Sequence, residues 1–304
     1  MPASHMVMWC HLVAKRKGVG LFCMGAGPKT GRPAAMEQSC HLPPTSPLHD
    51  TLRQCWQLDR QAEARAHETI IPKGLVEVIF NLNERESVTA RIGTQDFQLP
   101  RCFLSGFHSV PVQTWMPRQH SLFGMVLNPT AVASIFRLEA ADFVNQCLDL
   151  TLVHAPLLDL WHQLLEAASF AERVALVQRW LLPHRPELTA QERFLNHYLS
   201  SPTAPALTVP ALADQLCYSP RHLTRKLQAL TGMNTEQTLL YQKYQHAVGL
   251  MHATELSLTE IAHACQFTDQ AHFSKTFRGF TQLAPREYRR RKSHLPGHLF
   301  ADVA

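Results

Sequence analysis

Two short segments near the C-terminal end carry side chains that can bind the edges of nucleic-acid bases. Arginine binds guanine O6 and N7 with two hydrogen bonds, and glutamine binds adenine N6 and N7 in the same way. The segments lie about 50 positions apart and read Ser219-Pro220-Arg221-His222-Leu223-Thr224-Arg225-Lys226-Leu227 and Asp269-Gln270-Ala271-His272-Phe273-Ser274-Lys275-Thr276-Phe277. These residue types predict hydrogen bonding to duplex DNA.

Two helix-turn-helix units must position these side chains. In each unit a short apolar helix precedes a tight turn, and Ser219 in the first or Thr268 or Asp269 in the second is placed to cap the next helix. Apolar residues at i, i+4 and i+7 give each second helix an inner face, made of Leu223, Leu227 and Leu230 or of Phe273, Phe277 and Phe280. The remaining positions are therefore expected to point outward, namely Arg221, Thr224, Arg225 and Gln228, then Gln270, Ala271, His272, Ser274, Lys275 and Arg278.

The segment between the two units predicts a stiff connector. Leu240, Tyr244, Ala247, Val248 and Met251 recur at helical spacing, so 236–251 is expected to be one amphipathic helix. Two recognition helices held about 34 Å apart can enter successive major grooves on one side of the duplex. A single chain could then bind a bipartite site.

Charge follows the same division of the chain. The net charge is +5, and residues 207–292 hold 11 Lys and Arg against 6 Asp and Glu, whereas residues 1–206 hold 18 against 17. A basic excess confined to the helix-turn-helix region favours attraction to phosphate.

Other chemistries lack their motifs. The eight cysteines are scattered without C-x-x-C spacing, which is typical of a reduced compartment, and the 18 histidines form no H-x-H or H-E-x-x-H. We therefore expect no metal site, no cofactor and no enzyme activity. No segment approaches the roughly 18 apolar residues of a membrane span, and we expect a cytoplasmic protein.

Residues 203–292 resemble the DNA-binding domain of the AraC/XylS family of bacterial transcription regulators. The second half of the resemblance rests on Ile261-Ala262, Phe267-Thr268-Asp269-Gln270, His272 to Arg278 and Ala284-Pro285-Arg286-Glu287-Tyr288-Arg289. The first half rests on Ala213, Leu216, Ser219 to Leu223, Arg225 and Leu230-Thr231-Gly232. The chain departs from the family's usual turn glycines at Cys217, Gln266 and Gln282, and it has Tyr241 and Tyr244 where many members carry arginines.

The resemblance implies which outward side chains contact DNA. Base contacts in the family come from the early outward positions, here Arg221, Thr224, Arg225, Gln270, Ala271, His272 and Lys275. Ser274 and Arg278 are expected to contact phosphate, which positions the protein without specifying sequence. The alternative for each residue is a solvated surface side chain. For His222 and His272, which hold equivalent places in the two recognition helices, the alternative is a packing or capping role. The basic run could hold a phosphate or could stabilise the end of a helix, and it comprises Arg286, Arg289, Arg290, Arg291 and Lys292.

The N-terminal part predicts short strands followed by helices. Strands are expected at 75–82, 110–115 and 121–127, and helices at 131–138, 157–170, 171–182 and 191–199. Pro72 to Leu82, Trp56 and Phe123 to Pro129 resemble the cupin-like domain of one subgroup of AraC-type regulators. Five aromatic residues could line a pocket there or form its core, namely Trp56, Phe80, Phe103, Phe107 and Trp115.

The sequence thus predicts an α+β protein in five parts. These are an extension at 1–36, either disordered or placed upstream of the true start, a cupin-like β barrel at 37–130, a helical connector at 131–200, an all-α tandem helix-turn-helix domain at 203–292 and a tail at 293–304.

The predicted function is sequence-specific regulation of transcription. Promoter DNA is the expected partner, with RNA polymerase, a small-molecule effector and a second copy of the chain as further partners. One alternative is a DNA-repair methyltransferase of the adaptive-response type, which needs a Pro-Cys-His-Arg motif where this chain has Pro100-Arg101-Cys102-Phe103. Another is a DNA-binding protein whose N-terminal domain only dimerises.

Overall fold

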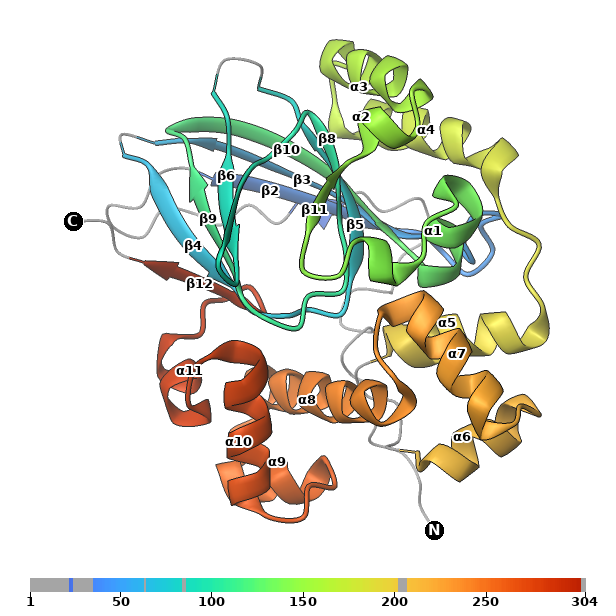
Figure 1. Ribbon diagram of the computed structural model, residues 1–304. Helices are drawn as coiled ribbons and strands as arrows, with labels where there is room; N and C mark the ends of the chain where they lie inside the picture. Colours follow the sequence, from blue (N-terminus) through green and yellow to red (C-terminus); the bar gives the residue numbers. More distant parts are fainter. Residues whose placement is uncertain (1–21, 24–34, 63, 84–85, 202–206, 302–304) are drawn as a thin grey trace.

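The computed structural model describes residues 22–23, 35–62, 64–83, 86–201 and 207–301 as a β domain lying on a layer of C-terminal helices (Figure 1). The predicted α+β class is confirmed. A seven-stranded sheet has the order β1 (Phe22–Cys23), β2 (Ala35–His41), β3 (Leu52–Gln61), β10 (Gln119–Leu127), β5 (Val76–Asn81), β8 (Cys102–Ser105) and β11 (Cys147–Asp149). A five-stranded sheet has the order β12 (His298–Ala301), β4 (Ala66–Ile70), β9 (Val112–Met116), β6 (Thr89–Ile92) and β7 (Gln95–Gln98).

Successive side chains of a strand point to opposite faces of its sheet, and this alternation produces two separate apolar layers. Side chains such as Phe103, Val112 and Leu122 pack between the two sheets, whereas Phe80 and Phe123 belong to the larger core that includes the connector helices. Within the described residues each sheet keeps two free ends, so the β domain is an open, two-sheet form of the expected barrel. The predicted strands are confirmed as β5, β9 and β10.

The five aromatic residues proposed as a pocket lining do not share one cavity. Phe80 and Phe107 are in the core on the helix side, while Phe103 and Trp56 belong to the cluster between the sheets. Trp115 is half-buried beside His67, with the Arg91 guanidinium 5.6 Å from its ring centroid. Most of the five aromatic residues therefore belong to the apolar core, which was the alternative to a pocket lining.

A helical segment follows the strands, and its helices up to residue 181 share the apolar core of the larger sheet. The segment comprises α1 (Pro129–Phe136), η1 (Ala140–Asp142), α2 (Leu150–Val153), α3 (Pro156–Glu166), α4 (Phe170–Leu181), η2 (Leu182–His184) and α5 (Ala190–Ser200). Trp161 in α3 is fully buried and donates its indole N–H to the Asn81 carbonyl at 2.7 Å. No helix in the described part of the chain is long and apolar enough to cross a membrane.

The C-terminal helices form the second layer. They are α6 (Val209–Leu216), α7 (Pro220–Thr231), α8 (Thr235–Ala253), α9 (Leu258–Ala264), α10 (Gln270–Thr281) and α11 (Pro285–Arg291). The predicted connector helix is confirmed as α8, but the β domain lies against it (Figure 1). Tyr241 and Tyr244 are therefore buried and donate their hydroxyls to the backbone carbonyls of His108 and Pro72. This explains why the expected amphipathic helix has few solvated positions.

The predicted extension falls mostly outside the described residues. Residues 1–21 and 24–34 are not described, and Phe22–Cys23 pair with Gln38 and Ser39 of β2. Residues 202–206, at the boundary between the predicted connector and the predicted helix-turn-helix domain, are likewise not described.

Three non-glycine residues occupy left-handed backbone conformations at helix ends in the C-terminal domain. Cys217, Gln266 and Gln282 have φ values of 54°, 56° and 60°, and they stand at the places where the family usually has glycine. A side chain there costs on the order of 1 kcal/mol, which glycine avoids at some entropic cost.

Replacing all three with glycine is expected to stabilise the protein by about 1–2 kcal/mol in total. Thermal unfolding checks this as a rise of a few degrees in Tm. Gln228→Gly, at an exposed position inside α7, is the opposite control and should destabilise by about 1 kcal/mol. A triple variant that melts at or below the wild-type temperature contradicts the prediction.

His108 makes stability depend on pH. Burial lowers the pKa of His108 from its ordinary 6.5 to about 4, with Glu77 raising it and Lys73 lowering it. The unfolded chain therefore binds a proton below pH 6.5 while the folded chain does not, so stability falls as pH drops from 6.5 towards 4. We expect a loss of about 3 kcal/mol at pH 4. His108→Gln should flatten this part of the denaturation profile, and equal slopes for both proteins would contradict the assignment.

Candidate nucleic-acid interface

The first unit presents a basic face above a closed apolar core. Ser219 caps α7 by accepting a hydrogen bond from the His222 amide at 3.2 Å, as predicted. Leu223 and Leu227 are fully buried, which turns Arg221 and Arg225 outward, and both guanidinium-bearing side chains are exposed. The helix thus offers two fork-shaped donors on one side.

The second unit repeats the arrangement with a different set of side chains. Asp269, not Thr268, caps α10 by accepting from the His272 amide at 2.7 Å. Phe273 and Phe277 are fully buried. The predicted contact residues are exposed with one exception, Ser274, which is half-buried; the exposed ones are Gln270, Ala271, His272, Lys275 and Arg278.

Two polar side chains of the first recognition helix are engaged within the protein. The Thr224 hydroxyl donates to the Pro220 carbonyl at 3.0 Å and lies 2.9 Å from the Thr235 hydroxyl, so it ties α7 to α8. His222 stacks on Tyr218 with ring centroids 4.3 Å apart and an interplanar angle of 8°. His222 thus makes a packing contact, which was the alternative to a contact with DNA.

Gln270 is oriented by a residue that the sequence pattern did not single out. Thr259, on the preceding helix α9, donates its hydroxyl to Gln270 Oε1 at 2.7 Å. That contact directs the carboxamide before DNA arrives, and Oε1 keeps a lone pair for an adenine N6 donor. In the first unit the corresponding positions hold Pro210 and Pro220, whose side chains form no hydrogen bonds, so this contact has no counterpart there.

We expect Thr259→Val to reduce DNA affinity by about fivefold, because a hydrogen bond of this kind contributes about 1 kcal/mol. The loss should appear on duplexes with adenine at the base pair that Gln270 contacts and disappear on duplexes with another base there. Competition binding measures the difference. An equal loss on both duplexes would show that Thr259 acts on the fold and not on Gln270.

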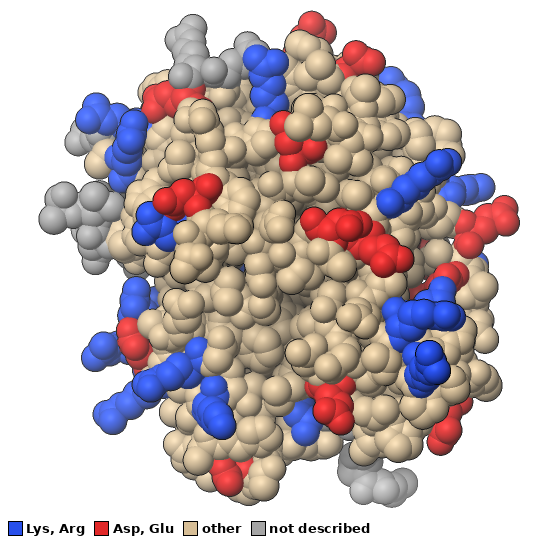
Figure 2. All heavy atoms as spheres, in the orientation of Figure 1, with Lys and Arg blue, Asp and Glu red and all other residues tan. Residues whose placement is uncertain are grey.

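The basic run around Tyr288, from Arg286 to Lys292, divides into two kinds of side chain. Arg289 donates to the Leu256 carbonyl at 2.7 Å, and Lys292 donates to the Met251 carbonyl at 2.6 Å. Both cations thus satisfy carbonyl groups at and beyond the C-terminal end of α8, where positive charge is stabilising. Arg286 and Arg290 are exposed. Figure 2 shows Lys and Arg gathering at the lower left of this face, where Figure 1 places α10 and α11.

Known proteins share both regions of the chain. Residues 212–291 match a family described as a helix-turn-helix domain, and residues 40–149 match one described as a domain of unknown function. An uncharacterized HTH-type transcriptional regulator, YijO of Escherichia coli K12, is 32% identical over 96 residues, which are 32% of this chain and 34% of that protein. The HTH-type transcriptional activator RhaS of Escherichia coli O1:K1 is 31% identical over 121 residues, which are 40% of this chain and 44% of that protein. The chain thus spans less than half the length of these relatives.

A solved transcriptional regulator from Chromobacterium violaceum carries the AraC-type DNA-binding domain and is 29% identical. The match covers 28% of this chain and 76% of that one, with a TM-score of 0.27. Because residues 212–291 match the helix-turn-helix family and resemble the AraC/XylS DNA-binding domain, we call them the AraC-type domain. A longer match, ToxT of Vibrio cholerae with an unsaturated fatty acid bound, covers 79% of this chain and 95% of that one at 12% identity and a TM-score of 0.43.

The AraC-type domain has a hydrophobic partner upstream of the matched residues. Leu195, Tyr198 and Leu199 of α5 pack with Leu212, Leu223 and other residues of the first unit in one cluster. Apolar periodicity predicted α5 as a helix, but it did not show which neighbour the helix packs against.

Proposed function

We propose that this protein is a sequence-specific transcription regulator whose recognition helices, α7 and α10, enter adjacent major grooves of a promoter. The observation that carries the proposal is the repeated geometry. In each unit the first two residues of the apolar face, Leu223 and Leu227 or Phe273 and Phe277, are fully buried. Arg221 and Arg225, or Gln270 and Lys275, stand exposed on the other side. These residue types match guanine and adenine edges. The Thr224 hydroxyl is already engaged with Thr235, which restricts its contact with a base. Our proposed DNA contacts remain the nine residues of the sequence analysis, namely Arg221, Thr224, Arg225, Gln270, Ala271, His272, Ser274, Lys275 and Arg278.

The packing supports a particular domain plan. Because α5 shares the core of the first unit, we place the start of the DNA-binding domain near residue 190 and its end near 292. The β domain and α1 to α4 form the regulatory part. We propose RNA polymerase, a small effector and a second copy of the chain as partners of that assembly, acting in the cytoplasm where promoter DNA lies.

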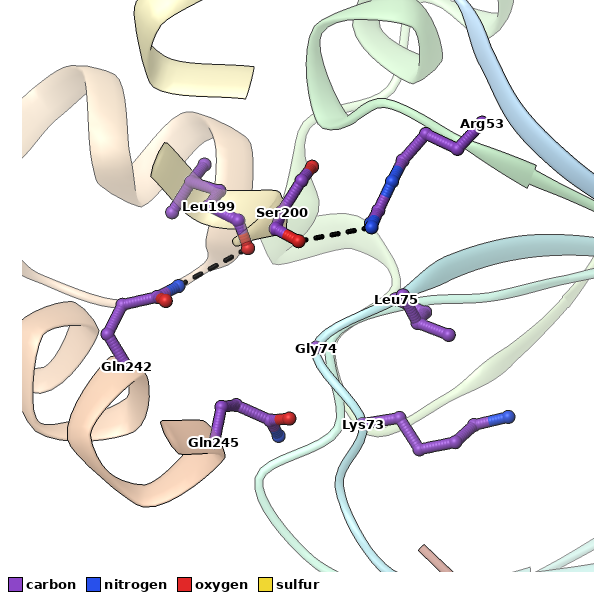
Figure 3. A pocket seen from close by; sticks show the side chains of 8 residues that line it. All are labelled: Arg53, Lys73, Gly74, Leu75, Leu199, Ser200, Gln242 and Gln245. Atoms are coloured by element: carbon purple, nitrogen blue, oxygen red, sulfur yellow. Dashed lines mark hydrogen bonds between the residues drawn. The ribbon is translucent and has the colours of Figure 1, made fainter. Parts of the chain in front are cut away.

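A pocket between the two domains is too small for most effectors. Arg53 donates to the Ser200 carbonyl at 3.1 Å, and Gln242 donates to the Leu199 carbonyl at 3.3 Å (Figure 3). The space between them measures about 120 Å³, below the roughly 300 Å³ at which ligand pockets begin. An effector of ordinary size would need another site or an opening of this junction.

The methyltransferase alternative is disfavoured by the state of its acceptor candidate. Cys102 is fully buried in β8, and burial together with the charge of Asp149 raises the pKa of its thiol. A thiol held in that form is a poor nucleophile, because the thiolate is the reactive species.

Genome-wide capture of DNA by the purified wild-type chain at physiological salt tests the proposal. We expect one bipartite motif with half-sites about one helical turn, or 10–10.5 base pairs, apart. Adding candidate small molecules to the captured duplex then tests for an effector through thermal stability and affinity. Capture without sequence preference would overturn the proposed function.

A further inference from the structure

The chain returns to the β domain after the last helix of the AraC-type domain. Residues 293–301, here called the strap, end in β12, which pairs antiparallel with β4 from His298 opposite Ile70 to Ala301 opposite His67. The Ile71 amide extends the pairing by donating to the Gly297 carbonyl at 2.9 Å. A strand edge otherwise presents unpaired N–H and C=O groups. The strap therefore supplies the edge strand of the five-stranded sheet (Figure 1).

Charged side chains fasten the strap at its first paired residue. His298 Nδ1 is hydrogen bonded to Glu68, and His298 Nε2 lies 3.5 Å from Lys73 Nζ. Lys73 in turn forms an ion pair with Glu77 at 3.3 Å. Glu68 and Glu77 are 5% and 6% exposed. Buried carboxylates require partners, and the strap contributes one of them.

The residue before His298, Gly297, ties the strap to the core of the second unit. The Gly297 amide donates to the Tyr288 hydroxyl at 3.2 Å, and that hydroxyl also lies 2.8 Å from His252 Nε2 of α8. Tyr288 is fully buried against Phe277 of the recognition helix α10. Gly297 has φ +84°, and a Cβ there would stand 3.2 Å from Lys73 Cγ. The strap thus links α10 to β4 through a short series of contacts.

The two units are attached to the β domain unequally. The second unit shares one continuous apolar core with the β domain and α8, which includes Phe273, Phe277, Tyr244 and Val78. The first unit has a separate core with α5. It meets the N-terminal part through side-chain contacts and not through a shared core. A Cβ at Gly232 would come within 2.3 Å of Val144, and Asn196 of α5 donates to the Thr130 hydroxyl of α1 at 2.7 Å.

We propose that the β4 edge and the Pro72-Lys73-Gly74 turn form a docking surface for the second helix-turn-helix unit, and that the strap locks the unit there. The second recognition helix then belongs to the same rigid body as the β domain, and the first unit is the one that adjusts to DNA. The proposal rests on the proposed function, because a locked second unit fixes where the distal half-site must lie. While the strap is docked, DNA affinity should therefore depend strongly on the spacing between the two half-sites.

Two measurements, made on the wild-type chain and on three variants, test the strap. One variant ends at Ser293, and a second, Leu299→Asp, keeps the chain length but puts a carboxylate at a position 2% exposed. His294→Ala, at an exposed strap position before β12, is the matched control. Hydrogen exchange of residues 67–71 reports docking without DNA. Affinity for duplexes with zero or two base pairs inserted between half-sites reports spacing stringency, because two base pairs rotate one half-site by about 70°.

We expect exchange of residues 67–71 to accelerate about tenfold or more in the truncated chain and in Leu299→Asp, and to stay at the wild-type rate in His294→Ala. The wild type should lose about tenfold in affinity on the inserted duplex, and the two disrupted chains less than about threefold. Unchanged exchange, or an equally steep spacing penalty after truncation, overturns the proposal. If the wild type binds no duplex, the proposed function fails, and the exchange rates alone then support or overturn the docked strap.

Discussion

Replacing Arg225 and Gln270 together with alanine is expected to weaken binding to the captured bipartite duplex by about 30-fold to 10⁴-fold. Each bidentate contact to a base is worth about 1–3 kcal/mol, and every 1.4 kcal/mol is tenfold in affinity. The two residues lie on separate recognition helices, so their losses should add. Both side chains are exposed, and truncating them leaves the buried leucine and phenylalanine faces intact. The double variant should therefore fold like the wild type.

Arg118→Ala is the matched control for the lost charge. Arg118 is exposed in the turn between β9 and β10, outside the AraC-type domain. Titrations at two salt concentrations separate the contributions, because a phosphate contact changes the salt slope whereas a base contact changes sequence preference. A double variant that keeps the wild-type preference, or one that loses no more affinity than Arg118→Ala, would contradict the assigned base contacts.

Local signals in the sequence predicted the two units well. The i, i+4, i+7 spacing of Leu223, Leu227 and Leu230 determined which side of α7 is buried, and that spacing is a property of the helix alone. The N-cap at Ser219 was likewise a local signal. The departures at Cys217, Gln266 and Gln282 coincide with positive φ, so the backbone keeps the turn even where the glycine is gone.

Contacts between distant segments were beyond such signals. Thr224 was expected outward because periodicity says nothing of Thr235, whose hydroxyl lies 2.9 Å away on α8. Tyr241 and Tyr244 were noted only as replacements for arginines, and their partners, the carbonyls of His108 and Pro72, lie more than a hundred residues upstream. The strap was expected to be a simple tail, because four residues of β12 carry too little pattern to indicate a strand.

Tyr244→Ala is expected to lower the free energy of unfolding by about 3–5 kcal/mol, as truncation of a large buried aromatic side chain does. The Tyr244 ring is 1% exposed and lies 4.8 Å from the Phe280 ring and 5.7 Å from the Phe277 ring, measured between centroids. Its hydroxyl donates to the Pro72 carbonyl at 3.1 Å. One side chain thus packs on the second recognition helix and also holds the turn before β5.

Tyr244→Phe separates the ring from the hydroxyl. The Pro72 carbonyl still accepts a hydrogen bond from Gln245 at 2.6 Å in this variant, so no buried acceptor is left unpaired. We therefore expect a loss of about 1 kcal/mol or less. Denaturant unfolding of the three proteins measures both steps. If alanine and phenylalanine destabilise equally, the ring contributes little, and the junction between α8 and the β domain depends on backbone pairing through the strap instead of on the aromatic core.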